Sequence, residues 1–363
     1  MSSPARPNPA RFPLLLLGIF SLLAAMWAGM LRIGLALPPL SPTLSGGHGP
    51  LMIAGFLGTV IGLERAVAMG RLWMFAAPAL AAAGGLLIIF GAPQLGAMSV
   101  TLSSAALILV FTQIVRVQPA LFNYILTLAA AVWLGGNLFW LFGTPITHVV
   151  PAWATFLVLT IAGERLELAR LVQISRGGTA ALLAILTALV AGAFLAPFDY
   201  SQGWRVTGLS LASLSLWLLR WDIARRTVRA RGLTRFIAFC MLLGYFWLLA
   251  GGLIALRYGF LYGGAYDAAL HAVFLGFVFS MIFGHAPVIF PAVLGVRMEF
   301  SPSFYSHLLL LHLSLLLRVG AGLAEWLPGR QRAIVLNVLA LLLFLLNTVR
   351  SVRRRPAHFR QGL

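Results

Sequence analysis

The feature that most constrains this chain is a series of apolar stretches, each about twenty residues long. Runs such as 12–37, 72–90 and 333–349 contain almost no charged residue. An α-helix needs about 20 apolar residues to cross roughly 30 Å of hydrocarbon. Hydrophobic residues make up 61% of the 363 positions and charged residues only 9%. A water-soluble domain has many more charged residues than this. The sequence therefore predicts an all-α polytopic membrane protein whose main partner is the lipid bilayer.

Breaks at Gly, Pro and Arg clusters divide residues 1–363 into about twelve transmembrane helices of a single membrane domain. Six arginines lie on one side of the predicted bilayer, and the other 20 lie on the side that holds the N-terminus. The positive-inside rule then predicts that both termini are cytoplasmic, in a bacterial inner membrane. The predicted spans are 12–37, 49–69, 72–91, 97–116, 119–142, 149–172, 178–197, 204–222, 233–257, 267–290, 303–322 and 332–352. The six outer arginines are Arg32, Arg205, Arg257, Arg318, Arg330 and Arg332.

Residue usage excludes several kinds of chemistry. The formal charge of +18 comes from arginines in short connections, where topology explains them, so we expect no nucleic-acid partner. The chain has no lysine and cannot form a Schiff base with retinal or pyridoxal phosphate. Cys240 is the only cysteine, which excludes a disulfide, a thiolate zinc site and an iron–sulfur cluster held by this chain alone.

The same spacing between a histidine and a Glu-Arg pair occurs twice, one hundred residues apart in the chain. His48 is followed sixteen positions later by Glu64-Arg65, and His148 sixteen positions later by Glu164-Arg165. A third unit of similar length places His271 at the equivalent position, although it lacks the Glu-Arg pair. The pattern predicts three diverged four-helix blocks. These blocks are 1–116, 117–232 and 233–363.

The three equivalent histidines His48, His148 and His271 are predicted to lie at a similar depth near the outer face. Imidazole is neutral near pH 7 and carries a ligand lone pair, so it suits iron or copper in an apolar setting. Two histidines from separate helices can hold a haem iron from both faces. The alternative is that each histidine only caps a helix or bonds a backbone carbonyl.

A second, inner metal site is the weaker hypothesis for the remaining histidines. His285 follows His271 by fourteen residues, about 21 Å along a helix and on nearly the same face. His307 and His312 enter their helix from the same side. They are five residues apart and face different directions, so at most one can join His285.

Charged residues near the helix ends give two further hypotheses. Arginine pairs well with the propionates of haem, which makes Arg32 and Arg257 at the outer depth candidate cofactor-binding residues, with ordinary interfacial anchoring as the alternative. The two Glu-Arg pairs are expected to bond crosswise, Glu64 with Arg165 and Glu164 with Arg65. Snorkelling toward the interface is the alternative for these pairs.

Two segments give the chain a family resemblance. His271 keeps a characteristic spacing to Gly276, Met281 and Gly284, and a second histidine segment spans 48–56. These segments resemble the NnrS family, polytopic haem- and copper-containing membrane proteins linked to nitric oxide stress. The resemblance agrees with a twelve-helix fold and implies haem, with copper as a second metal. We expect the haem to be of b type. The chain departs from the family pattern at Pro50 and Leu51, where the family has a second histidine and an acid, and at His285, which replaces a methionine.

The leading hypothesis is an inner-membrane haem protein in nitric oxide stress or respiratory metabolism, with nitric oxide or a redox protein as partner. His48 and His271 are the expected axial ligands. His148 comes third, either as an alternative ligand or as part of a second metal site, and His285 is a further metal candidate. A transporter or channel is one alternative, although every acid lies near a helix end, away from mid-bilayer. A non-catalytic assembly partner of respiratory complexes is the other.

Overall fold

The computed structural model describes residues 11–168 and 174–353 and confirms an all-α polytopic membrane protein. Eleven of its helical spans are long and apolar enough to cross a membrane. A twelfth long helix, α9 (Tyr200–Trp221), is more polar and packs between α8 (Arg176–Leu195) and α11 (Gly232–Tyr258). Each predicted span therefore corresponds to one of these helices, so the expected architecture is confirmed.

The remaining helices follow one another through short connections. The first span is α1 (Arg11–Arg32), which ends five residues earlier than predicted. Residues 33–43 form a loop instead. The Nε1 atom of Trp27 donates a hydrogen bond to the carbonyl of Pro38 in this loop. The other regular helices are η3 (Leu72–Phe75) with α4 (Ala76–Ile89), α5 (Pro93–Val117), α6 (Leu121–Leu141), α7 (Ile146–Leu168), α10 (Ala224–Thr227), α14 (Phe304–Leu323) and α15 (Leu327–Ser351).

Two histidine-bearing spans are built from several helical segments each. The first runs through η1 (Leu44–Gly47), α2 (His48–Pro50), η2 (Leu51–Gly58) and α3 (Thr59–Met69). The second runs through α12 (Gly263–His271), η5 (Ala272–Phe279) and α13 (Ser280–Leu294). Both η2 and η5 are eight-residue π-helices, a rare form that is frequent at functional sites.

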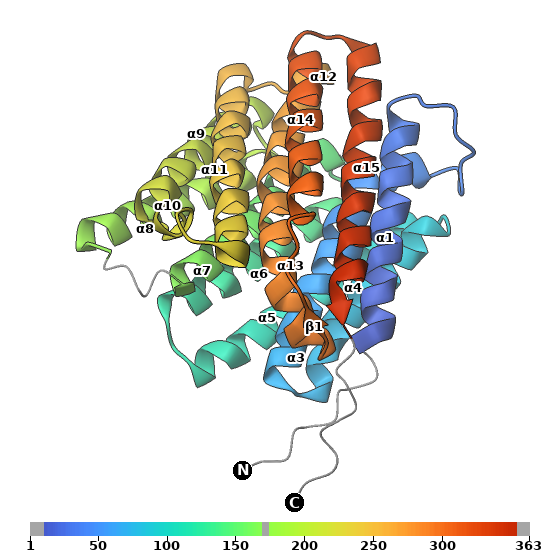
Figure 1. The fold of residues 1–363 in the computed structure, drawn as a ribbon. Helices are drawn as coiled ribbons and strands as arrows, with labels where there is room; N and C mark the ends of the chain where they lie inside the picture. The colour runs from blue at the N-terminus through green and yellow to red at the C-terminus, as the bar shows by residue number, and fades with distance from the viewer. Residues whose placement is uncertain (1–10, 169–173, 354–363) are drawn as a thin grey trace, which may run out of the picture.

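The first and last helices of the chain meet and close the bundle (Figure 1). At one end, Gln331 of α15 donates a hydrogen bond to the carbonyl of Ile33, just after α1. At the other end, Arg11 donates to the carbonyl of Val293, and the strands β1 (Arg297–Met298) and β2 (Val352–Arg353) pair in antiparallel fashion. The start of α1 and the end of α15 therefore lie at the same end of the bundle.

Exposed aromatic side chains mark the opposite end. They stand where α4, α6, α8 and α11 finish, and Phe142 and Phe198 are each at least 80% exposed. Aromatic side chains of this kind are enriched where a membrane protein meets the headgroup level. The aromatic residues are Phe90, Phe142, Phe198, Phe260 and Tyr262.

Candidate functional site

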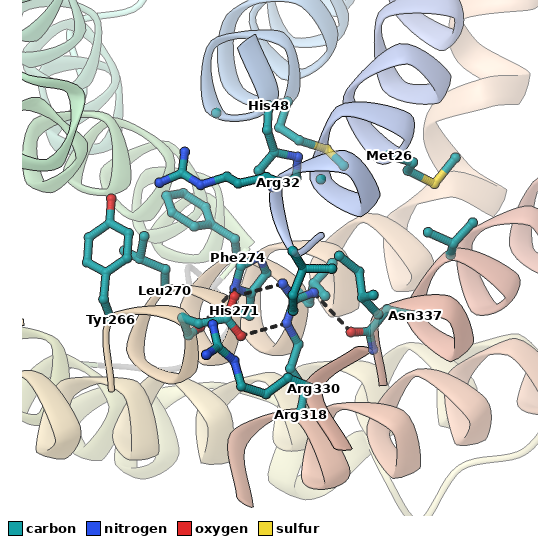
Figure 2. Close-up of a pocket in the computed structure, with 18 of the residues that line it drawn as sticks. Met26, Arg32, His48, Tyr266, Leu270, His271, Phe274, Arg318, Arg330 and Asn337 are labelled. Atoms are coloured by element: carbon teal, nitrogen blue, oxygen red, sulfur yellow. Dashed lines mark hydrogen bonds and ion pairs between the residues drawn. The ribbon is translucent and has the colours of Figure 1, made fainter. Parts of the chain in front are cut away.

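His48 and His271 lie side by side, each shortly before the π-helix of its span. Their ring centres are 6.1 Å apart and the ring planes are inclined by 28°. Figure 2 shows the two side chains approaching from different helices across one cavity. The sequence correctly paired these two histidines, although 223 positions separate them.

Backbone carbonyls fix the orientation of both rings. The Nδ1 atom of His48 lies 2.8 Å from the carbonyl oxygen of Ala25, and that of His271 lies 2.8 Å from the carbonyl oxygen of Asp267. A carbonyl can only accept, so each Nδ1 carries the proton and each Nε2 keeps its lone pair. This is the arrangement usually found around a metal-binding imidazole.

A glycine on α1 makes room for the ring of His48. A methyl group added at Gly29 would lie 2.9 Å from the Cε1 and Nδ1 atoms of that ring, closer than side-chain carbons normally approach. Residue 29 therefore has to be small for His48 to lie against α1 and reach Ala25.

The two π-helices repeat the same contact one layer deeper. Phe56 follows His48 by eight residues and Phe279 follows His271 by eight residues, and the two phenylalanine rings stack with centres 6.1 Å apart. A π-helix accommodates one more residue per turn than an α-helix, so it changes which side chains share a face. The two spans therefore share the same offset from the contacting histidine to the contacting phenylalanine.

The histidines face a cavity of about 430 Å³ between α1, η2, η5, α14 and α15. That volume lies in the range of roughly 300–1,000 Å³ that is typical of cofactor and ligand sites. Its walls are mostly apolar, with Met26, Met52, Leu57, Phe279 and Leu341 among the lining residues. The cavity therefore suits a flat or elongated apolar body placed between the two imidazoles.

Three arginines line the same cavity. Arg318 is bonded to both carboxylate oxygens of Asp267, at 2.9 and 2.8 Å, and also donates to the side chain of Asn337. One Asp267 oxygen lies 3.3 Å from Nδ1 of His271, so this network also steadies that ring. Arg32, an expected cofactor-binding residue, is exposed and is among the lining residues, and Arg330 lies on α15 facing the cavity (Figure 2).

Arg257 and Arg205 do not reach the cavity. Arg257 is exposed and lies 5.8 Å from the ring of Tyr258, and Arg205 donates to the carbonyl of Leu256. The expectation that Arg257 binds the cofactor is not supported by this placement. Arg318 and Arg330 take the positions facing the ligand space. Both stand among the six outer arginines of the sequence, but their direction depends on how α14 and α15 rotate against α1, which spacing alone does not give.

His148 does not join the other two histidines, contrary to the expectation. Its Nδ1 atom lies 3.2 Å from the carbonyl of Ala196 and its ring packs 4.6 Å from that of Tyr200. Ile146 and Val150 of the same helix do line the cavity. A residue midway between them is rotated by about 160–200° and faces the opposite side of the helix.

The other three membrane histidines each bond to partners of their own. The Nε2 atom of His285 lies 3.4 Å from a guanidinium nitrogen of Arg165. A metal ligand would need the lone pair of this nitrogen to be free. His312 accepts from Trp247 Nε1 at 2.8 Å and contacts Ser280. His307 is bonded to Asn347 and stands among phenylalanine rings, the nearest being that of Phe283 at 4.7 Å. Within residues 11–168 and 174–353, no three His, Cys, Asp or Glu side chains group as a metal site.

The crosswise charge pairing is half confirmed. Arg65 bonds Glu164 across two helices, as expected. Glu64 does not bond Arg165; it lies 3.6 Å from its own neighbour Arg65. Arg165 instead binds Asp222 with two hydrogen bonds, at 2.7 and 3.1 Å, with both side chains at most 5% exposed. Asp222 stands just beyond α9, which brings it beside α7 only in the folded bundle.

A known family matches almost the whole described chain. The profile of the family described as Domain of unknown function (DUF8744) matches residues 11–353, which covers the entire bundle including both π-helices. No curated protein matches the chain.

Proposed function

The chain belongs to the family described as Domain of unknown function (DUF8744), and from the cavity we propose that it is a haem-binding membrane protein. In this proposal His48 and His271 are the two axial ligands of a b-type haem. The protein then acts in respiratory metabolism or in the response to nitric oxide, as its resemblance to the NnrS family suggests.

The separation of the two imidazoles carries the proposal. Two imidazoles bonded to one metal through nitrogen, with bonds of about 2 Å, place their ring centres about 6 Å apart. The observed 6.1 Å agrees with that spacing. Both Nε2 atoms are free to act as ligands, since both Nδ1 atoms are engaged with carbonyls.

The surroundings of the pair also fit a haem. The cavity offers apolar walls for the ring and cationic side chains for its acid groups. The sole cysteine, Cys240, is buried and outside the cavity lining, so the chain has no pair of thiols for covalent attachment. A non-covalent haem is therefore the form that this site can hold.

The residues around the pair favour electron transfer. Haem iron held by two histidines exchanges one electron and offers no open position to a substrate. Asp267, Arg318 and Asn337 hold His271 in one orientation, and the carbonyl of Ala25 does the same for His48. A site held this firmly needs little rearrangement when its charge changes. The partner that this reading requires is a redox protein, or nitric oxide if one histidine is displaced.

Copper is a second candidate for the same histidines. Imidazole nitrogen and thioether sulfur both suit Cu(I), and Met26 and Met52 line the cavity beside the pair. Metal analysis of the purified protein separates the two: iron at one equivalent supports haem, whereas copper without a porphyrin spectrum supports the alternative.

The visible spectrum of the protein purified in detergent tests the proposal. We expect a Soret band, and a low-spin ferric signal in electron paramagnetic resonance, from a haem with two histidine ligands. His48→Ala and His271→Ala should each abolish the low-spin signal. A colourless and well-folded preparation would instead favour a transporter, a channel or an assembly partner of respiratory complexes.

The orientation in a bacterial inner membrane is part of the same proposal. The arginine-rich end, which contains the start of α1 and the end of α15, then faces the cytoplasm, in agreement with the positive-inside rule. The aromatic end and the mouth of the cavity near Arg32 face outward. Labelling of a cysteine introduced at the exposed position Phe142 in intact cells tests this orientation.

A further inference from the structure

The cavity lining carries an unbalanced positive charge. Arg32, Arg318 and Arg330 line it, and Asp267 is the only carboxylate among the lining residues. Arg318 and Asp267 are bonded to each other, so their charges cancel. Among the residues that the structure describes, neither Arg32 nor Arg330 forms an ion pair. Three positive charges against one negative charge leave two cations facing the ligand space.

Arg330 is the more constrained of these two cations. It is half-buried, and its Nε atom has neither contact with solvent nor a hydrogen-bond acceptor within the described part of the chain. Its side chain extends toward His271 (Figure 2), and both residues line the cavity. Arg32 is exposed at the mouth, on the opposite wall formed by α1. A buried guanidinium donor without an acceptor is costly, and a ligand carboxylate removes that cost.

We propose that Arg330 and Arg32 bind the two carboxylates of an amphipathic dianion whose apolar body fills the cavity. Arginine recognises carboxylate with two parallel hydrogen bonds, and two carboxylates neutralise the excess charge of the lining. The acid edge of the ligand then lies at the outer mouth, and its apolar part lies deeper, against Met26 and Leu57. This inference rests on the proposed function where the ligand is haem, which carries two propionates on one edge.

Arg318 has a different role in the same cavity. Its guanidinium is already occupied by Asp267 and Asn337, and Asn337 is in turn bonded to Ser314. Arg318 therefore positions His271 through Asp267, and three of its five N–H donors are already engaged. Removing Arg318 should disturb the histidine, while removing Arg330 should disturb only the recognition of acid groups.

Binding of metal-free protoporphyrin IX and of its dimethyl ester tests the proposal, with fluorescence as the readout in detergent. The metal-free ring needs no histidine ligand, so it reports the arginines separately from the haem site. We expect the wild-type protein to bind the free acid about tenfold more tightly than the diester, since charge-assisted hydrogen bonds are lost in the ester. Arg330→Leu should remove most of that preference, and Arg330→Lys should keep part of it.

Arg332→Leu is the matched control. Arg332 lies two residues further on α15, is exposed, and faces the ring of Trp326 at 5.9 Å instead of the cavity. It should keep the wild-type preference, and all variants should keep the wild-type unfolding temperature. An Arg330→Leu protein with an undiminished preference overturns the proposal, as does a wild-type protein that binds neither porphyrin or binds both equally.

Failure of the proposed function would look different. If His48→Ala and His271→Ala leave the haem spectrum unchanged while Arg330 still controls binding of the free acid, the histidines are not the ligands and the carboxylate site stands. If the histidine variants lose the low-spin signal while the Arg330 variants discriminate normally, the haem site stands and the carboxylate assignment is wrong.

Discussion

The three histidine-bearing spans hold equivalent positions in the sequence pattern but differ in helix type and in the direction of their histidines. The spans of His48 and His271 each contain an eight-residue π-helix after the histidine and bring their rings to 6.1 Å. The span of His148 is the α-helix α7 throughout its described length, and its histidine points to Ala196 and Tyr200. Backbone geometry therefore distinguishes spans that the pattern of residues makes equivalent.

The charged ends of the spans also differ in burial and pairing. Arg165 of α7 is among the most buried charged residues of the bundle and is fully paired with Asp222. Arg65 of α3 is less deeply buried, and no comparable pair follows His271, where the sequence has Pro287 and Val288. The first and third histidine spans thus bring their histidines to the cavity, while α7 contributes Ile146 and Val150 to its wall and is tied to Asp222 by its ion pair.

The largest expected effect comes from substitution of the histidines themselves. His48→Ala or His271→Ala should abolish the low-spin haem signal, because each removes one of two ligands. His148→Ala should retain a full Soret band, since its side chain faces away from the cavity. Haem content per protein, from the pyridine haemochromogen assay, measures this difference. Equal loss in all three variants would restore the three-fold equivalence that the sequence suggested.

The second effect concerns the anchoring role of α7. Asp222→Ala leaves the buried guanidinium of Arg165 without its partner, which typically costs about 3–5 kcal/mol in the free energy of unfolding. Unfolding in detergent, followed by circular dichroism, measures this loss. The double variant Arg165→Leu with Asp222→Leu should be less destabilised than Asp222→Ala, because no charge is stranded. Full stability of Asp222→Ala would show that the pair does not hold α7.

Sequence patterns predicted the parts of the site that depend on helix number and spacing. The apolar runs fixed the spans, and the recurrence of histidine identified His48 and His271. The π-helices could not be predicted, because nothing in 51–58 or 272–279 separates a π-helix from an α-helix in local preference. They follow the two histidines that line the cavity, whereas the described part of α7, which carries His148, is α-helical. Asp222 and Arg330 were missed for a similar reason, since each depends on how distant helices rotate against one another.

The third prediction concerns the glycine that accommodates His48. Gly29→Ala adds a methyl group 2.9 Å from the imidazole and should weaken haem binding at least tenfold, or about 1.4 kcal/mol. The helix itself should become slightly more stable, because alanine is the better helix former. Gly320→Ala is the control, as a methyl group there meets no atom within 4 Å. Titration of apoprotein with haem compares the two, and equal affinities would place the ring of His48 elsewhere.

The smallest effect separates the two glutamates at the charged end of the spans. Glu164 is hydrogen-bonded to Arg65, whereas Glu64 lies 3.6 Å from the same guanidinium. Their side chains are 25% and 26% exposed, so burial does not distinguish them. Glu164→Gln should therefore cost about 1 kcal/mol in the free energy of unfolding, and Glu64→Gln only a few tenths. Haem content should stay at the wild-type level in both, because neither residue lines the cavity. If Glu64→Gln is the more damaging change, the crosswise bond to Arg65 is not the contact that joins α3 to α7, and Glu64 has a partner that helix packing alone does not reveal.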